Sequence, residues 1–379
     1  MPIPVEKIQM VDLKGQYLKI KPVIDTAIQT CINTSSFIKG PQVSVFEKYF
    51  GQYLNVNHVI SCANGTDALQ VAMMALGLQV GDEVIMPAFT YVATAEVAAL
   101  LGLKPVLVDV DPNTFTISPA ALEAAIGPKT KLVVPVHLFG QCADMQSVTN
   151  LCTAHDLLLL EDAAQAIGAT YTFSEGKTSM AGAMGALGTT SFFPSKNLGC
   201  FGDGGAVYTN DDVLAPKARM IANHGQVQKY EHETIGVNSR LDSIQAAILT
   251  EKLVYLPIYT QARQWAADVY DAALENLVAV DIPYRSPQST HVFHQYTLKV
   301  PANDRDKLKE YLNRKNIPSM IYYPMPLHHQ KAYAGVARIS GDLSVTEELC
   351  SRVISLPMHT ELSDDQIHYI AEAVIDYFS

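Results

Sequence analysis

Between residues 59 and 210 the chain alternates short apolar runs with segments whose apolar residues recur at helical spacing. The runs at residues 105–110, 131–136 and 157–160 are almost continuously apolar. Strands that are apolar along their whole length are typical of a parallel sheet that is covered on both faces. The pattern therefore predicts an α/β fold with a mostly parallel central sheet between layers of helices.

The pattern changes after Asn210, and this change indicates a second, smaller domain. Further elements are expected at about residues 240–256, 262–274, 295–300, 304–315 and 363–378. A chain of 379 residues is also too long to fold around one small hydrophobic core. We predict an N-terminal arm of about twenty residues and a large domain within residues 1–255. A small C-terminal α+β domain would follow over residues 256–379.

Charge and composition exclude several classes of function. The formal net charge is −11, from 27 basic and 38 acidic residues, which argues against nucleic-acid binding. Residues 1–29 show no signal-peptide pattern, and no apolar stretch approaches the length of a membrane span. The six cysteines have no metal-ligand spacing, so reduced thiols are expected. We expect a cytoplasmic protein with no metal site.

Lys196 lies in surroundings that are unusual for a surface lysine. Phe192 and Phe193 precede it, Ser191 lies five residues before it, and a glycine-rich turn follows at residues 202–205. In isolation Lys196 is most simply a solvated lysine. Apolar neighbours, however, would desolvate the amine and ease its deprotonation, as a lysine that forms an imine requires.

Asp162 ends the apolar run at residues 157–160, just after Glu161. A carboxylate at the mouth of a buried strand must meet a cation or a hydrogen-bond donor. A protonated pyridine nitrogen would satisfy it, and Gln165 could reach a phenolic oxygen of the same ligand. A salt bridge to an arginine or a helix cap is the alternative interpretation.

Two further segments follow predicted strands. At Asn64-Gly65-Thr66 a strand turns into a helix, where free backbone amides and the Thr66 hydroxyl favour an anion. An ordinary helix cap explains the same residues. Tyr91 follows another strand end, where its ring could stack on a flat cofactor or simply pack in the core.

These pieces are weak singly, but they occur in order on successive strand ends of one α/β domain, where ligands gather. A lysine amine, a buried acid and a hydroxyl-and-amide phosphate site are the requirements of a pyridoxal phosphate enzyme. The sequence therefore predicts such an enzyme, with Lys196 and Asp162 as its catalytic residues.

The motifs resemble those of the sugar aminotransferases of the DegT/DnrJ/EryC1/StrS family, within fold type I of the pyridoxal phosphate enzymes. The likeness covers nearly the whole chain. It is carried by residues 11–14, 88–94, 135–141, 161–165, 191–205, 236–240 and 355–359.

The resemblance implies a role for each matching residue. Lys196 would hold the cofactor covalently and later move the proton, and Asp162 would pair with the pyridine nitrogen. Gln165 would bind the ring oxygen, and Tyr91 would stack on the ring. The phosphate would be bound by Gly65, Thr66, Ser191 and, from a neighbouring subunit, Asn238. This implies a homodimer with shared active sites, to which Arg240 is donated in the same way.

Within the family, the chain most resembles the enzymes that aminate UDP-2-acetamido-2-deoxy-3-keto-glucuronate at its 3-position. The arginine that matches Arg240 contacts the sugar carboxylate there, which a planar guanidinium suits. This chain has Tyr322-Tyr323-Pro324 where the family commonly has His-Tyr-Pro. Tyr323 matches the family tyrosine, whereas Tyr322 replaces the histidine and leaves the identity of the sugar open.

The resemblance thus implies transamination of a nucleotide-linked keto sugar with glutamate as donor, in a pathway such as O-antigen or other surface polysaccharide synthesis. One alternative is the same reaction on another keto sugar, such as a dTDP-linked 3-keto- or 4-keto-6-deoxyhexose. A sugar dehydratase of the same family would have histidine in place of Lys196. A catalytically silent binding or regulatory relative would not need to retain Lys196, Asp162, Gln165 and Ser191.

Overall fold

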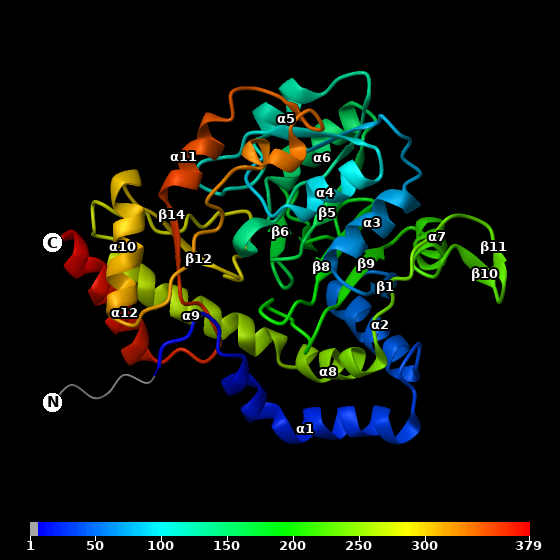
Figure 1. Cartoon of the computed structure of the whole chain (residues 1–379), viewed down its shortest axis with the longest axis horizontal. Coiled ribbons are helices and arrows are strands. Elements are labelled where there is room, and N and C mark those ends of the chain that lie inside the picture. Colours follow the sequence, from blue (N-terminus) through cyan, green and yellow to red (C-terminus); the bar gives the residue numbers. More distant parts are fainter. Residues whose placement is uncertain (1–6) are drawn as a thin grey trace.

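The computed structural model describes residues 7–379 and has at its centre an eight-stranded sheet (Figure 1). The strand order is β1-β9-β8-β5-β4-β2-β3-β13. Neighbouring strands are parallel except at β9, which is antiparallel to both β1 and β8. The predicted mostly parallel sheet is therefore confirmed. The strands are β1 (His58–Cys62), β2 (Glu83–Pro87), β3 (Lys104–Val108), β4 (Thr130–Val133), β5 (Leu158–Asp162), β8 (Leu187–Ser191), β9 (Gly205–Thr209) and β13 (Arg338–Ile339).

Helices cover both faces of this sheet and close two apolar cores. In β2, Ile85 packs into one core while Val84 and Met86 pack into the other, because successive side chains of a strand point to opposite faces. The first core is closed by α2 (Pro41–Leu54), α5 (Pro119–Ala125), α6 (Met145–Ala154) and α8 (Ser243–Leu253). The second is closed by α3 (Gly65–Ala75), α4 (Ala93–Leu100) and α7 (Leu214–Ile221).

The N-terminal segment, which we expect to be an arm packed on the body of the protein, contains a long helix. Helix α1 (Leu13–Thr34) begins inside the predicted arm and packs its isoleucines Ile20 and Ile24 against Ile248 of α8. Its start is set by Asp12, whose carboxylate accepts a hydrogen bond from the Gly15 amide at 2.8 Å. Residues 1–6 of the predicted arm lie outside the described residues.

The C-terminal part has its own core, formed around the antiparallel pair β12 (Tyr296–Lys299) and β14 (Val353–Leu356). The helix predicted at 262–274 starts earlier, at Leu256, because Pro257 fits the first turn of a helix. The division at residue 255 stays a prediction, and β13 from beyond it joins the large sheet beside β3. The helices of this part are α9 (Leu256–Leu274), α10 (Ala302–Arg314), α11 (Ser344–Arg352) and α12 (Asp364–Phe378).

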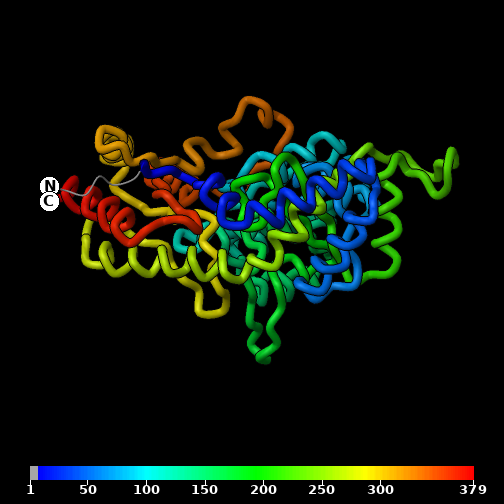
Figure 2. Tube along the Cα trace, turned by 90° about the horizontal axis from the view of Figure 1, so that it is seen from below, coloured from blue at the N-terminus to red at the C-terminus, as the bar shows by residue number. Residues whose placement is uncertain are grey.

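Two hairpins project from the body of the molecule (Figure 2). They are β6 (Thr170–Thr172) with β7 (Thr178–Met180), and β10 (Gln226–Gln228) with β11 (Glu231–His232). Short 3₁₀ turns complete the chain at η1 (Leu138–Gly140), η2 (Leu327–His329) and η3 (Lys331–Tyr333). Within residues 7–379, none of the helices is both long enough and apolar enough to cross a membrane.

Candidate active site

A cavity of about 510 Å³ opens where several strands of the sheet end. Because β5 and β8 are parallel neighbours, their last residues, Asp162 and Ser191, reach the same edge of the sheet. The predicted residues that line this cavity are Gly65, Thr66, Tyr91, Asp162, Gln165, Ser191, Lys196, Tyr322 and Tyr323.

One end of the cavity is suited to a phosphate. Helix α3 begins there at Gly65, and its first amides have no acceptor within the helix. The Asn64 side chain caps the helix by accepting a hydrogen bond from the Asp67 amide at 2.8 Å. A Cβ atom on Gly65 would lie 2.6 Å from the Ser191 Cβ, so only glycine lets the helix start approach Ser191 this closely. Backbone amides and a hydroxyl thereby converge on one small space.

Asp162 is held as a hydrogen-bond acceptor on the cavity wall. Only 7% of the residue is exposed, and its Oδ2 accepts a hydrogen bond from the Thr94 hydroxyl at 3.0 Å. Its Oδ1 accepts one from the Ala164 amide at 3.1 Å. The two hydrogen bonds fix the orientation of the side chain, which suits it to accept a hydrogen bond from a protonated pyridine nitrogen.

The side-chain amide of Gln165 is oriented by contacts at both ends. Its Oε1 accepts a hydrogen bond from the Phe139 amide at 2.8 Å, so its Nε2 faces the cavity and donates to the Tyr323 hydroxyl at 3.2 Å. Burial raises the pKa of the Tyr323 hydroxyl, which therefore stays protonated. Gln165 and Tyr323 thus present two donors to a ring oxygen.

Lys196 is half-buried on the loop after β8. Burial lowers the pKa of its ammonium group from 10.5 to about 8, and the negative charge of Asp162 opposes part of this fall. A substantial fraction of the amine is therefore neutral near physiological pH, as nucleophilic attack on a carbonyl group requires.

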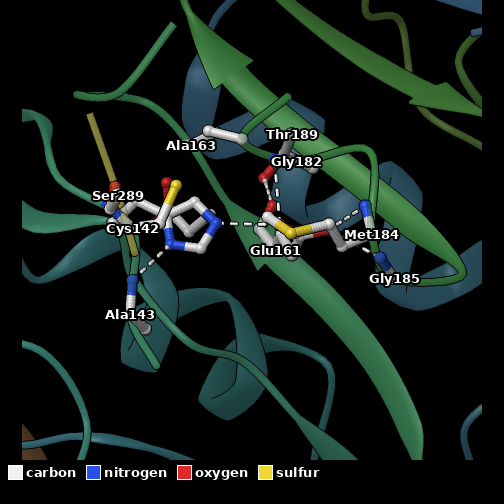
Figure 3. A network of polar contacts seen from close by, with 12 residues as sticks. Cys142, Ala143, Glu161, Ala163, Gly182, Met184, Gly185, Thr189 and Ser289 are labelled. Carbon is white, nitrogen blue, oxygen red and sulfur yellow. Dashed lines mark hydrogen bonds and ion pairs between the residues drawn. The ribbon is translucent and has the colours of Figure 1, made fainter. Parts of the chain in front are cut away.

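A buried polar network supports the strand that carries Asp162 (Figure 3). The preceding residue, Glu161, is fully buried and accepts hydrogen bonds from the amides of Gly182, Met184 and Gly185 at 2.9, 2.6 and 2.6 Å. His137 Nδ1 accepts from the Ala143 amide at 3.2 Å, so its Nε2 donates to Glu161 at 2.8 Å. The network satisfies this buried carboxylate and fixes the end of β5.

Sequence reasoning missed His294 and Gln295, which also line the cavity. His294 is 6% exposed, and its Nδ1 has no hydrogen-bond partner among residues 7–379. Burial, helped by the charge of Lys196, lowers the pKa of His294 well below its usual value, so the imidazole is neutral. Neither residue lies in a recognisable motif, and only the fold brings them to Lys196.

Asn238 and Arg240 do not line this cavity within the single chain. Asn238 is exposed, and Arg240 lies on a separate cavity of about 210 Å³. The chain by itself therefore does not bring these two predicted residues to Lys196.

No metal site was expected, yet His328, His329 and Glu347 bring their ligand atoms within 4.8 Å of one another. Both imidazole Nε2 atoms lie close to Glu347 Oε1, at 3.0 and 3.3 Å. Contact of the two imidazole rings with one carboxylate accounts for this arrangement, and the residues do not line the active-site cavity.

The arrangement fits pyridoxal phosphate: the α3 amides and Ser191 suit the phosphate, Asp162 suits the ring nitrogen, and Lys196 suits the aldehyde carbon. Fold and site together define a fold-type I pyridoxal phosphate enzyme. A model of the DegT/DnrJ/EryC1/StrS aminotransferase family matches residues 19–375, and the chain belongs to this family.

Similar proteins span the whole chain. It is 44% identical over 373 residues to a "pleiotropic regulatory protein" of Geobacillus stearothermophilus, covering 98% of both chains. It is 44% identical over 367 residues to the UDP-2-acetamido-2-deoxy-3-oxo-D-glucuronate aminotransferase of Pseudomonas aeruginosa, covering 97% of this chain and 99% of that protein. A dTDP-3-amino-3,4,6-trideoxy-alpha-D-glucose transaminase of Streptomyces venezuelae is 38% identical, with 98% and 96% covered.

Solved structures agree with this assignment. An aminotransferase of the same family from Brucella abortus superimposes with a TM-score of 0.93 at 41% identity, covering 98% of this chain and all of that one. NtdA of Bacillus subtilis, solved with bound cofactor PMP, gives a TM-score of 0.89 at 32% identity, covering 100% and 86%. The protein is thus a nucleotide-sugar aminotransferase that uses pyridoxal phosphate, as the sequence predicted.

Proposed function

We propose that this enzyme transfers the amino group of glutamate to the 3-position of UDP-2-acetamido-2-deoxy-3-keto-glucuronate. The observation that carries the proposal is the joining of Lys196, Asp162 and Gln165 in one cavity of a chain 44% identical to the Pseudomonas enzyme. The products would be 2-oxoglutarate and the 3-amino sugar nucleotide. The proposal places the reaction in the cytoplasm and in surface polysaccharide synthesis.

The proposed cofactor-binding residues all line the cavity around Lys196, which supports their assignment. The amides of Gly65 and Thr66, with the Ser191 hydroxyl, bind the phosphate, and Asp162 binds the ring nitrogen. Gln165 binds the ring oxygen. Tyr91 is 57% exposed, and its ring centre lies 6.3 Å from that of Tyr323, so its face is free to stack on the cofactor ring.

Pyridoxal phosphate supplies a protonated ring that takes up the electron pair released at the substrate carbon. Asp162 would bind the protonated ring nitrogen, because two hydrogen bonds hold its side chain in place on the cavity wall. Lys196 Nζ takes the proton from the α-carbon of glutamate in the first half-reaction. In the second half-reaction it delivers a proton to C3 of the sugar.

The proposal includes a homodimer with shared active sites. Asn238 and Arg240 are away from the cavity of their own chain, which accords with their donation to a partner. Asn238 would bind the cofactor phosphate there, and Arg240 the sugar carboxylate. Tyr322 and Tyr323 would contact the sugar from the other side.

The second candidate substrate is a dTDP-linked keto sugar. The observations that favour it are the 38% identity to the Streptomyces transaminase and the presence of Tyr322 in place of the common histidine. A dehydratase is disfavoured by Lys196. A silent regulatory role, suggested by the name of the Geobacillus protein, is disfavoured by the complete cofactor constellation.

The test is a substrate panel read by mass spectrometry. Purified holoenzyme is incubated with glutamate and either the UDP-linked 3-keto-glucuronate or a dTDP-linked keto-deoxyhexose, and the aminated nucleotide sugar is measured. Preferred amination of the UDP-uronate supports the proposal. Amination of the dTDP sugar alone would replace the substrate, and no amination by a cofactor-loaded protein would remove the catalytic proposal.

A further inference from the structure

A second cavity carries an unusual concentration of positive charge for a chain of net charge −11. It has a volume of about 210 Å³ and lies apart from the cavity around Lys196. Three cationic side chains line it, namely Lys39, Arg219 and Arg240, together with one carboxylate, that of Glu47. Cations that outnumber the carboxylates around one space favour the binding of an anion.

Of the three cations, Arg219 is already neutralised. Its guanidinium pairs with the Glu47 carboxylate at 3.0 Å and donates to the Val59 carbonyl at 2.7 Å. For Lys39 and Arg240 the structure of residues 7–379 contains neither an ion pair nor a hydrogen bond to the side chain. Arg240 and Arg219 both lower the pKa of Lys39, after burial, which shows that the charges act on one another.

The backbone holds Lys39 beside the loop that carries Arg240. Ile38 forms a β-bridge with Asp242, and the Ser243 amide donates to the Phe37 carbonyl at 2.9 Å. On the other side of Lys39, the Gly40 amide donates to the Ser243 hydroxyl at 3.0 Å. Lys39 itself has a φ of 52°, so a lysine occupies a backbone position in the left-handed region, which favours glycine.

We propose that Lys39 and Arg240 form one anion-binding subsite for the nucleotide sugar bound at the active site of a second copy of this chain. This inference rests on the proposed function and adds Lys39 as a specificity-determining residue. The ligand group is an anionic oxygen group, either the uronate carboxylate or the diphosphate. A guanidinium suits a carboxylate through paired donors, and an ammonium adds a point charge that suits either group.

The test measures nucleotide-sugar affinity by titration calorimetry on holoenzyme. The ligands are UDP, UDP-N-acetylglucosamine, the corresponding UDP-N-acetylglucosaminuronate and a dTDP-hexose. Lys39→Met is compared with Lys39→Arg, which keeps the charge, and with Lys177→Met. Lys177 is an exposed lysine between β6 and β7, and it controls for the loss of one positive charge.

We expect Lys39→Met to raise the Kd for the nucleotide sugar about tenfold. Lys39→Arg and Lys177→Met should both keep the wild-type Kd. The loss should also shrink in high salt, because salt screens the charge of an exposed lysine. A loss confined to the uronate identifies the carboxylate as the ligand group. An equal loss for UDP and both UDP sugars identifies the diphosphate.

Other outcomes separate this inference from the proposed function. If the wild-type enzyme binds the uronate and Lys39→Met binds it equally well, the subsite is wrong while the proposed substrate stands. If the wild-type enzyme binds only the dTDP-hexose, the proposed substrate is wrong, and the same variants measured on that ligand decide the subsite. If the holoenzyme bound none of the four ligands, both the proposed function and the Lys39 subsite would be overturned.

Discussion

Gln165 donates a hydrogen bond to the hydroxyl of Tyr323, 158 residues further along the chain, at 3.2 Å. The contact joins the loop after β5 to the C-terminal part of the chain across the active-site cavity. Since Gln165 Oε1 is held by the Phe139 amide, the amide cannot flip without losing a hydrogen bond. The hydrogen bond therefore links the two sides of the cavity before any ligand binds.

Replacing Lys196 should abolish transamination while leaving the fold intact. We expect Lys196→Ala to lower kcat at least about 1,000-fold, because both the covalent attachment and the proton transfer depend on Nζ. The measurement is the visible absorbance of the reconstituted protein before and after glutamate, with 2-oxoglutarate release as the rate. A variant that kept a glutamate-sensitive absorbance band would contradict the role of Lys196.

The rate of cofactor attachment should depend on pH through the same amine. The folded pKa of Lys196 is lowered from 10.5 to about 8, so the neutral amine is lost as pH falls through 8. The rate at which pyridoxal phosphate attaches to the apoprotein, measured by stopped-flow absorbance, should therefore increase as pH rises. The midpoint of this increase should lie near pH 8. Because Asp162 raises this pKa, Asp162→Asn should move the midpoint to lower pH, and an unmoved midpoint would contradict the coupling.

Gly65 can be tested against a matched glycine. A Cβ at position 65 meets Ser191 Cβ at 2.6 Å, whereas a Cβ at Gly127 has its nearest neighbour at 3.9 Å. Gly65→Ala should raise the Kd for pyridoxal phosphate about tenfold or more by pushing α3 from Ser191, and Gly127→Ala should leave it unchanged. Fluorescence titration of the apoprotein measures both. Equal affinities would show that the close approach is not needed for phosphate binding.

The buried network beneath Asp162 should matter for stability. Glu161→Gln would replace one carboxylate oxygen with an NH2 group, which is itself a donor. This group would face N–H donors of His137, Gly182, Met184 and Gly185. We expect a loss of about 3–5 kcal/mol in the free energy of unfolding, measured with denaturant on apoprotein. Glu123→Gln is the control, since Glu123 is exposed. A loss no larger than that of the control would mean that the network does not support β5.

Shared active sites can be tested by combining two defective chains. Lys196→Ala and Arg240→Ala homodimers should each have little activity. In a heterodimer purified with two different tags, one site would receive both intact residues, and activity should recover to about half of the wild-type value. Activity no higher than in the parents would show that Arg240 does not act across subunits.

Much of the lining of the cavity around Lys196 could be predicted, because it depends on the order of strands and helices along the chain. Asp162 ends an apolar strand, Ser191 ends the neighbouring strand β8, and parallel strands bring their carboxyl ends to one edge of a sheet. The start of a helix at Gly65 could also be predicted from the sequence, since a strand, a capping residue and a helical pattern follow one another there. The expected arm includes the start of α1, but its packing against α8 is a tertiary contact that the local sequence does not specify.

The sequence by itself determined the α/β architecture and the family, and it singled out Lys196 and Asp162 as candidate site residues. Apolar periodicity and motif order are properties of neighbouring residues. Only the tertiary structure decided that His294 and Gln295 join Lys196, and that Lys39 lies beside Arg240. These pairs are distant along the chain. Their meeting depends on how strands and helices pack, through contacts such as the Ile38–Asp242 bridge that leave no local pattern in the sequence.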